Sequence, residues 1–108
     1  MIQLTVMYGQ PQDPAAFDRH YQETHAALAQ KIPGLKGFAI TRSASLNPQE
    51  ASPYYVIANL YFENMAAFQA GLQSPEGQAA ANDLQNFASG GATLVVGEVQ
   101  VYTPVSIR

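Results

Sequence analysis

The first residues of the chain alternate between apolar and polar positions. Every second residue from Ile2 to Tyr8 is apolar, and Gln3 and Thr5 lie between them. A period of two residues is typical of a β-strand with one buried face. The sequence "GQPQDP" follows, and its glycine and prolines interrupt strand pairing. The pattern therefore predicts a strand over residues 2–8.

A helix is predicted to begin at Pro14. Asp13 supplies an N-cap oxygen, and proline suits the first helical position because the N–H that it lacks would be unpaired there anyway. Pro33-Gly34 must end the helix. Its apolar stripe at helical spacing contains Phe17, Tyr21, Thr24, Leu28 and Ile32.

The rest of the chain alternates between strands and helices. Strands are predicted over residues 35–43, 54–62 and 93–102. Asn64 is expected to cap a short helix, and Ser74-Pro75 to begin another that ends at "ASGGA". The order βαββαβ is that of the ferredoxin-like fold. We therefore expect one α+β domain over residues 1–108, with a four-stranded antiparallel sheet and both helices on one face.

Both faces of the predicted sheet are largely apolar. In the strand 54–62, one side carries Val56 and Leu60, while the other carries Ile57 and Tyr61. A sheet with one face in water should alternate cleanly, and no helix remains to cover the second face. A homodimer joined through the sheet faces, a dimeric α+β barrel, is therefore expected. Charged residues are only 12% of the chain, which agrees with such burial. The alternative is a monomer with a surface rich in Gln and Asn.

Composition argues against several other classes of function. The net charge is −3, and the five Lys and Arg residues are scattered, so no nucleic-acid partner is expected. The absence of cysteine excludes disulfides and thiolate chemistry. No segment has the length and apolarity of a transmembrane span, and the N-terminus lacks signal-peptide features. We expect a cytoplasmic protein without a membrane partner.

The two histidines give a weak metal signal. His20 and His25 are five residues apart, whereas two ligands on one helix face are usually four apart. We therefore expect no metal and no other cofactor. His20 lies off the apolar stripe and is interpreted as solvated.

Three segments together resemble the EthD-like family of the dimeric α+β barrel superfamily. They are "FDRHYQETHAALAQKIPGLKGF" (17–38), "LYFENMAAFQAGLQSPEGQAAANDLQNFA" (60–88) and the last strand. The chain departs from the family pattern at Ala27, where proline is frequent, and at Phe38, where an aromatic hydroxyl is frequent. The resemblance implies the predicted fold and an association with the oxidative degradation of ethyl tert-butyl ether. The superfamily includes cofactor-free monooxygenases, isomerases and cyclases, and the fold alone does not choose among them.

His25 is the main candidate for chemistry. It lies at the edge of the apolar stripe, one turn after Tyr21, and it matches the helix histidine of the family. An imidazole there could act as a general acid–base at neutral pH, with Tyr21 contributing a hydroxyl. The alternatives are a half-buried histidine bonded to a backbone carbonyl and a packed tyrosine.

We therefore expect a small-molecule-binding protein or enzyme of oxidative catabolism, with an apolar or aromatic ligand between helix and sheet. If it is an enzyme, a cofactor-free oxidation, an isomerisation or a cyclisation is expected. The alternative is a non-catalytic accessory protein of an oxidative degradation system. Asn59 and Tyr61 would serve equally well in a dimer contact. The proposed ligand-binding residues are Phe17, Leu28, Phe38, Asn59 and Tyr61.

Overall fold

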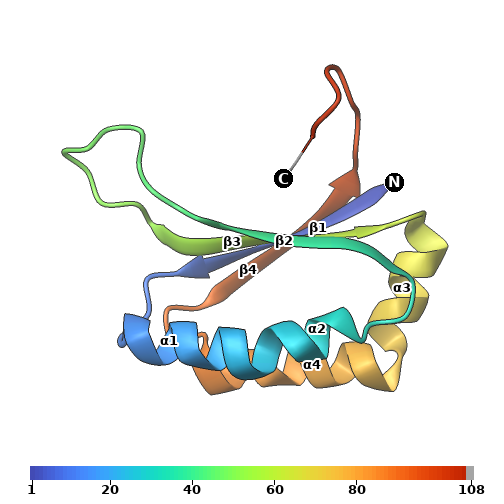
Figure 1. The fold of residues 1–108 in the computed structure, drawn as a ribbon, viewed down its shortest axis with the longest axis horizontal. Coiled ribbons are helices and arrows are strands. Elements are labelled where there is room, and N and C mark those ends of the chain that lie inside the picture. Colours follow the sequence, from blue (N-terminus) through green and yellow to red (C-terminus); the bar gives the residue numbers. More distant parts are fainter. Residues whose placement is uncertain (107–108) are drawn as a thin grey trace.

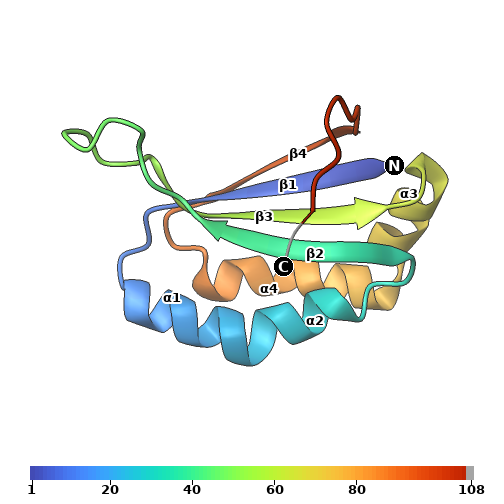
Figure 2. The same ribbon diagram turned by 45° about the horizontal axis from the view of Figure 1, so that its top comes forward.

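The computed structural model describes residues 1–106, which form one antiparallel sheet covered on one face by helices (Figures 1 and 2). The strands lie in the order β2-β3-β1-β4, so the expected ferredoxin-like α+β fold is confirmed. The elements are β1 (Ile2–Gly9), α1 (Pro14–His20), the π-helical turn η1 (Tyr21–His25), α2 (Ala26–Gln30), β2 (Leu35–Arg42), β3 (Tyr54–Phe62), α3 (Met65–Gln73), α4 (Pro75–Phe87) and β4 (Ala92–Glu98).

The alternation at the N-terminus places β1 at the centre of the sheet. Its even-numbered residues from Ile2 to Tyr8 are all buried against the helices. Leu4 lies opposite Leu60 of β3 on one side and Val96 of β4 on the other. A slip of one residue would turn this apolar set toward the other face, so the pattern fixes the register.

All three predicted helix caps are present. The side chain of Asp13 accepts a hydrogen bond from the Ala16 N–H, and Asn64 accepts one from the Ala67 N–H. Ser74 accepts one from the Gly77 N–H at the start of α4. Each cap satisfies an N–H that has no partner inside its helix, so the sequence correctly located where these helices begin.

The helix after β1 is interrupted by a π-helical turn, which the sequence pattern did not predict. The Ala26 N–H bonds to the Tyr21 carbonyl, five residues earlier. The predicted stripe is wrong at two of its five positions, because Thr24 is exposed and Leu28 is only half-buried. In a regular α-helix each step of four residues drifts by about 40° around the axis, and the wider turn offsets part of that drift. The buried positions are Phe17, Tyr21, His25, Ala29 and Ile32.

The last strand ends at Glu98, earlier than the predicted end at residue 102. Glu98 pairs with Ile2, and the Val99 N–H donates to the Met1 carbonyl at 2.9 Å. Because β1 begins at Ile2, the pairing of the two strands ends there. The chain then leaves the sheet (Figure 1), and Tyr102 is 92% exposed.

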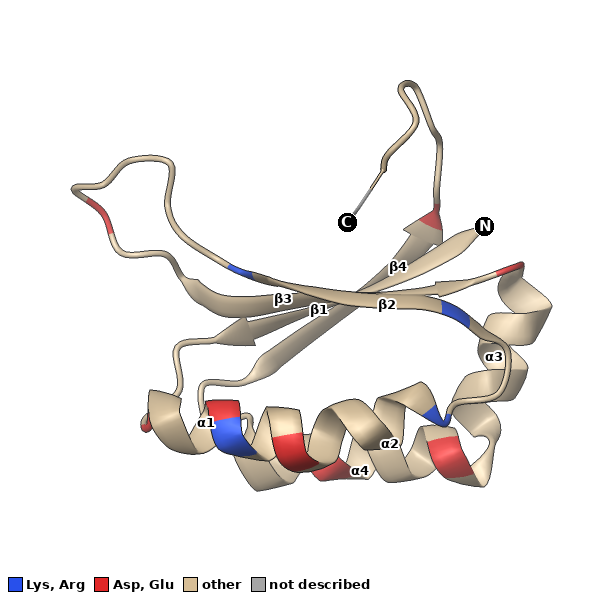
Figure 3. Cartoon of the chain, viewed as in Figure 1, with Lys and Arg blue, Asp and Glu red and all other residues tan. Residues whose placement is uncertain are grey.

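The face of the sheet away from the helices has few charges (Figure 3). The central strands β1 and β3 contain no Asp, Glu, Lys or Arg at all. Asn59 accepts hydrogen bonds from Thr5 at 2.8 Å and from Gln3 at 3.2 Å on this face. Ile57 and Tyr61 flank Asn59 there and are only partly buried, so the face is a mixed surface of apolar and internally paired polar groups. Within residues 1–106, no helix is long and apolar enough to cross a membrane.

Candidate functional site

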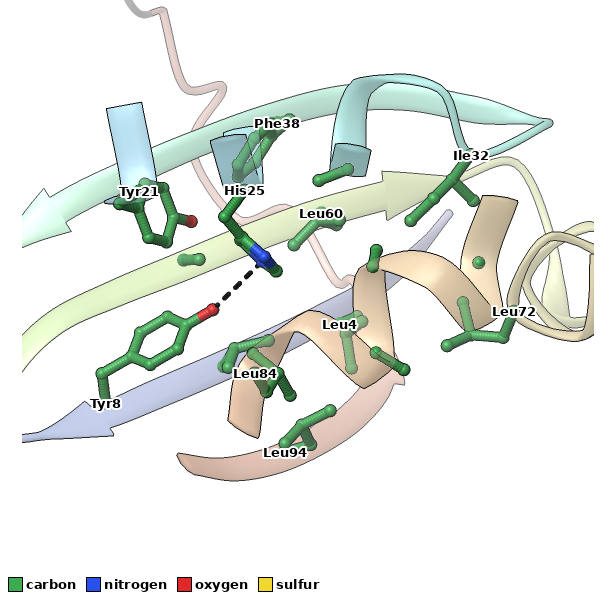
Figure 4. A pocket seen from close by; sticks show the side chains of 16 residues that line it. Leu4, Tyr8, Tyr21, His25, Ile32, Phe38, Leu60, Leu72, Leu84 and Leu94 are labelled. Carbon is green, nitrogen blue, oxygen red and sulfur yellow. Dashed lines mark hydrogen bonds between the residues drawn. The ribbon is translucent and has the colours of Figure 1, made fainter. Parts of the chain in front are cut away.

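A cavity of about 50 Å³ lies between the helices and the sheet (Figure 4). Its walls come from β1, η1, α2, β2, β3, α3, α4 and β4, so nearly every element of the fold contributes. Most of the lining is aliphatic, for example Leu4, Leu60 and Leu84. The polar side chains in the wall are those of Tyr8, Tyr21 and His25.

His25 is held by hydrogen bonds at both ring nitrogens. Its Nδ1 lies 2.9 Å from Oδ2 of Asp83 on α4. Its Nε2 lies 3.5 Å from the Tyr8 hydroxyl, a long contact at the limit of hydrogen bonding (Figure 4). The residue is only 6% exposed. One nitrogen is thus firmly fixed, while the other faces the cavity through a weak contact.

Asp83 is a buried carboxylate with three side-chain donors. Besides His25, it accepts from Asn86 Nδ2 at 2.9 Å and from His20 Nε2 at 2.9 Å to each of its oxygens. Burial by itself would raise the pKa of Asp83, but the hydrogen bonds from Asn86, His20 and His25 outweigh burial and hold that pKa below its usual value. Asp83 is therefore ionised at neutral pH. Because an ionised carboxylate only accepts, both imidazoles must donate an N–H to it.

Burial lowers the pKa of His25, and the neighbouring Asp83 opposes this effect only in part. The imidazole is therefore neutral at pH 7. Its Nδ1 carries the proton that Asp83 receives, so Nε2 presents a lone pair to the cavity. This arrangement is the one that a general base requires, with its tautomer fixed by a carboxylate.

The two cavity tyrosines keep their protons at neutral pH. Burial raises the pKa of Tyr21 to about 12, and burial together with the adjacent Tyr21 raises the pKa of Tyr8 further still. Both phenols therefore remain hydroxyls that can donate hydrogen bonds. Their rings meet edge to face, with centroids 5.8 Å apart.

The π-helical turn brings His20 and His25 to the same carboxylate. In an α-helix, residues five apart point about 140° away from each other. Here both nitrogens reach Asp83, and both rings pack on Phe87, with centroid distances of 5.1 and 4.7 Å. The interpretation of His20 as a solvated residue is wrong, since its side chain is 27% exposed and bonded to Asp83.

Asp83 was missed by the sequence reasoning, although α4 contains a signal for it. The buried residues of this helix are Gly77, Ala80, Asp83 and Phe87, spaced three or four apart. An acidic residue inside such a stripe needs buried partners. Gly77 fixes where α4 packs, because a Cβ there would collide with the Gly71 carbonyl of α3.

The structure brings together only some of the predicted site residues. His25, Tyr21 and Phe38 line the cavity. Phe17 lies outside it, in an aromatic cluster with Tyr8 and Phe87.

Three of the proposed ligand-binding residues lie elsewhere. Leu28 lines a separate groove on the surface with Lys31. Asn59 and Tyr61 lie on the opposite face of the sheet, because β3 buries its even-numbered residues against the helices. Among the residues that the structure describes, no group of three or more His, Asp or Glu side chains has the arrangement of a metal site.

A comparison with known families matches residues 9–91 to the EthD domain. The chain belongs to the EthD family. The matched range contains the π-helical turn and the whole of α4, and so it contains His20, His25 and Asp83. Tyr8, another polar residue of the site, lies one residue before the matched range.

Individual relatives agree with this assignment. The chain is 45% identical over 106 residues to an uncharacterized 11.0 kDa protein of Rhodococcus erythropolis from the thcB-thcC intergenic region, covering 96% of this chain and 100% of that protein. A crystal structure of an ethyl tert-butyl ether degradation (EthD) family protein from Bacillus halodurans is 37% identical, with a TM-score of 0.86. It covers 93% of this chain and 99% of its own.

More distant solved structures share the fold alone. SnoaB of Streptomyces nogalater, described as a cofactor-independent oxygenase, aligns with a TM-score of 0.66 at 17% identity, over 96% of this chain and 97% of its own. Other neighbours, at 15% and 23% identity, are described as dimeric ferredoxin-like proteins. The EthD-family chain described here therefore has a fold found in proteins described as dimers and in one described as an oxygenase.

The site geometry of this EthD-family chain suits proton transfer. Asp83 can stabilise an imidazolium on His25, and Tyr8 and Tyr21 can donate hydrogen bonds to an oxygen that gains negative charge. Among residues 1–106, no lysine or arginine lines the cavity, and its surroundings are apolar. In such surroundings each of these interactions is stronger than in water.

Proposed function

We propose that this EthD-family protein is a small enzyme that binds a neutral ring compound between helix and sheet, and that His25 removes a proton from it. One observation carries the proposal: a buried neutral imidazole whose Nδ1–H is held by Asp83 and whose Nε2 faces an apolar cavity. General bases of this type contribute typically about 10²–10⁴-fold to a rate.

The composition of the cavity wall supports one class of substrate. Because the described residues that line the cavity include no cation, a carboxylate or phosphate would lose its hydration there without a partner. Aliphatic and aromatic walls favour an apolar or aromatic ring, and the tyrosine hydroxyls suit a carbonyl or phenolic oxygen. We therefore infer an enolisable ketone, a lactone, a phenol or a hydroquinone as substrate.

The proposed step uses only the chain's own residues. The His25 Nε2 lone pair takes a proton either from a C–H next to a carbonyl or from an O–H. In the first case the C–H electron pair forms a C=C bond and the carbonyl oxygen gains the charge of an enolate. In the second case the electron pair stays on the oxygen as a phenolate. Tyr8 and Tyr21 donate to that oxygen. Return of the proton at another carbon gives an isomer, attack on an internal carbonyl gives a cyclic product, and reaction with dioxygen gives an oxygenated one. SnoaB, a cofactor-independent oxygenase, shows that the fold is compatible with the last of these.

The size of the cavity supports a second candidate. At about 50 Å³ it is much smaller than the roughly 300–1,000 Å³ of usual ligand pockets. A non-catalytic accessory protein would need no ligand there. We favour the enzyme because Ala81 and Leu94 line the cavity and are exposed, so α4 and β4 leave an edge at which the cavity could widen.

We further propose that the chain forms a homodimer through the outer faces of the sheet. The support is the uncharged outer surface of β1 and β3 and the half-exposed Val95 of β4 beside it. Neighbours of the same fold described as dimers support the same arrangement. Homodimer interfaces are typically apolar at their centre.

Hydrogen–deuterium exchange tests the enzymatic proposal without knowledge of the reaction. The protein is incubated in D₂O with 2-tetralone, a γ-lactone, 1-naphthol or a hydroquinone. Loss of the exchangeable C–H signals is followed by NMR, and binding by thermal shift. We expect binding of at least one compound and, for the carbon acids, exchange that His25→Gln slows at least about 10²-fold.

Two matched variants examine whether the cavity is the binding site. Ala81→Phe should block the exposed edge of the cavity, whereas Ala79→Phe places the same side chain on the same helix outside it. Binding lost in the first and kept in the second supports the site. If no compound binds and none exchanges, the accessory function is the better account.

A further inference from the structure

Asp83 is shared by two histidines that face different surroundings. His25 contacts it from inside, where its side chain is 7% exposed and lines the cavity. His20 contacts it from outside, where its side chain is 27% exposed and lines an open polar groove over α1 and α4. Both nitrogens lie 2.9 Å from the carboxylate. The carboxylate thus links the cavity to the solvent.

Few other titratable groups surround the two imidazoles. His25 faces Tyr8 from β1 and Tyr21 from η1, and both are uncharged at neutral pH. His20 shares its open groove with Asp13, Arg19 and Glu23, which are exposed. Among residues 1–106, Asp83 is the charged group that hydrogen-bonds to either ring. The shared carboxylate is therefore the hydrogen-bonded connection between the two histidines.

We propose that His20 is a positioning residue that sets the proton affinity of His25 through the carboxylate they share. A positive charge on His20 is balanced by Asp83, which it contacts through both carboxylate oxygens. Less of the carboxylate's negative charge is then available to stabilise an imidazolium on His25. When His20 is neutral, Asp83 supports the proton on His25 more strongly. The charge of His20 thereby changes the strength of the base that lines the cavity.

The geometry favours this coupling. His20 approaches both oxygens of Asp83, so it interacts with the whole carboxylate and not with one edge of it. Burial is the largest cause of the lowered pKa of His25, the charge of His20 lowers it further, and Asp83 raises it. Stacking on Phe87, at 5.1 Å and 22°, holds the His20 ring in place. The consequence for catalysis rests on the proposed function of His25, but the coupling itself does not.

The test measures the protonation of His25 directly by ¹⁵N NMR of the ring nitrogens as a function of pH. The chain has only two histidines, so in a His20→Gln variant the remaining imidazole signal is that of His25. Glutamine can still donate an N–H to Asp83 but cannot become charged. His20→Leu removes both the charge and the donor while keeping an apolar contact with Phe87.

We expect the midpoint of the His25 titration to rise in both variants, by roughly one pH unit in His20→Leu and by less in His20→Gln. A rise in either variant supports the proposal. The same protonated fraction of His25 at every pH in wild type and both variants, or a lower fraction, would overturn it. Denaturant melts confirm that each variant is folded, and His20→Gln alone suffices if His20→Leu does not fold.

This experiment needs no substrate, so its outcome is separate from that of the proposed function. If the midpoint rises but no ring compound binds, the coupling holds and the enzyme proposal fails. If the midpoint is unchanged while His25→Gln abolishes exchange of a carbon acid, His25 is the base and His20 only packs beside it.

Discussion

Replacement of Asp83 by Asn tests the site most directly, through its effect on the free energy of unfolding. The carboxylate accepts from three side chains, whereas an asparagine has one acceptor oxygen and an NH₂ group. If the amide oxygen takes the place of Oδ2, His25 and His20 keep an acceptor. The new NH₂ then faces the NH₂ of Asn86, which is exposed and can turn to water.

The stability cost follows from the two hydrogen bonds that lose their charge. A hydrogen bond to a charged group contributes about 1.5–3 kcal/mol and a neutral one about 0.5–1.5 kcal/mol, so each loses about 1 kcal/mol. We expect Asp83→Asn to lower the free energy of unfolding by about 2 kcal/mol. Asp83→Ala strands a buried His25 N–H as well and should cost about 3–5 kcal/mol.

Urea denaturation at pH 7.5 measures both values, with Asp18→Asn as the matched control. Asp18 also accepts hydrogen bonds from two side chains, the charged guanidinium of Arg42 and the hydroxyl of Tyr55, but its own side chain is 33% exposed. Asp18→Asn should therefore lower the free energy of unfolding by no more than about 1 kcal/mol. If Asp83→Asn lowers the free energy of unfolding no more than Asp18→Asn does, then Asp83 does not hold His25 through a strong hydrogen bond. That result would contradict both the proposed base and its coupling to His20.

Three further predictions concern pH and assembly. The folded-state pKa of His25 lies below its unfolded value of about 6.5. The free energy of unfolding should therefore fall as pH drops below about 6.5, by up to about 1.4 kcal/mol per pH unit. Urea melts from pH 5 to 8 should show this slope in wild type, and His25→Gln should lose it. The pKa of Tyr21 is raised to about 12, so the neutral phenol contributes fully to the stability of the fold below about pH 10. That contribution is lost as pH rises toward 12. Tyr21→Phe should lessen the loss of folded protein at alkaline pH, measured by circular dichroism. Val95→Lys should reduce the mass measured by light scattering from that of a dimer toward that of a monomer. Val96 is about equally exposed but lies on the helix side of β4, so Val96→Lys should leave the dimer intact. A wild-type protein that is monomeric at micromolar concentration would contradict the dimer.

The fold was predictable because each local signal agreed with the others. Alternation identified β1, and Asp13, Asn64 and Ser74 marked where helices begin, so the element order and topology followed. The end of β4 was not predictable from its valines, because it depends on where β1 begins and therefore on a partner distant in sequence.

The site was predictable only in part, for a similar reason. Helical spacing placed His25 beside Tyr21, but the spacing assumed a regular α-helix. The π-helical turn moves His25 from the edge of the apolar stripe to its centre and brings His20 to the same side. Asp83 lies 58 residues away, on another helix, so its pairing with His25 depends on the packing of α4 against the π-helical turn.

The same packing argues that Asp83 serves chemistry more than stability. Ala80 and Phe87 already supply buried contacts along α4, and an apolar residue at position 83 would need no polar partners. Replacement of a buried ionic cluster by apolar residues is often neutral or stabilising by about 1–4 kcal/mol. A buried carboxylate and imidazole, joined by a second imidazole and an amide at the edge of the core, are therefore difficult to explain as packing. They are readily explained if His25 must gain and lose a proton beside an apolar cavity, because that requires a nearby negative charge.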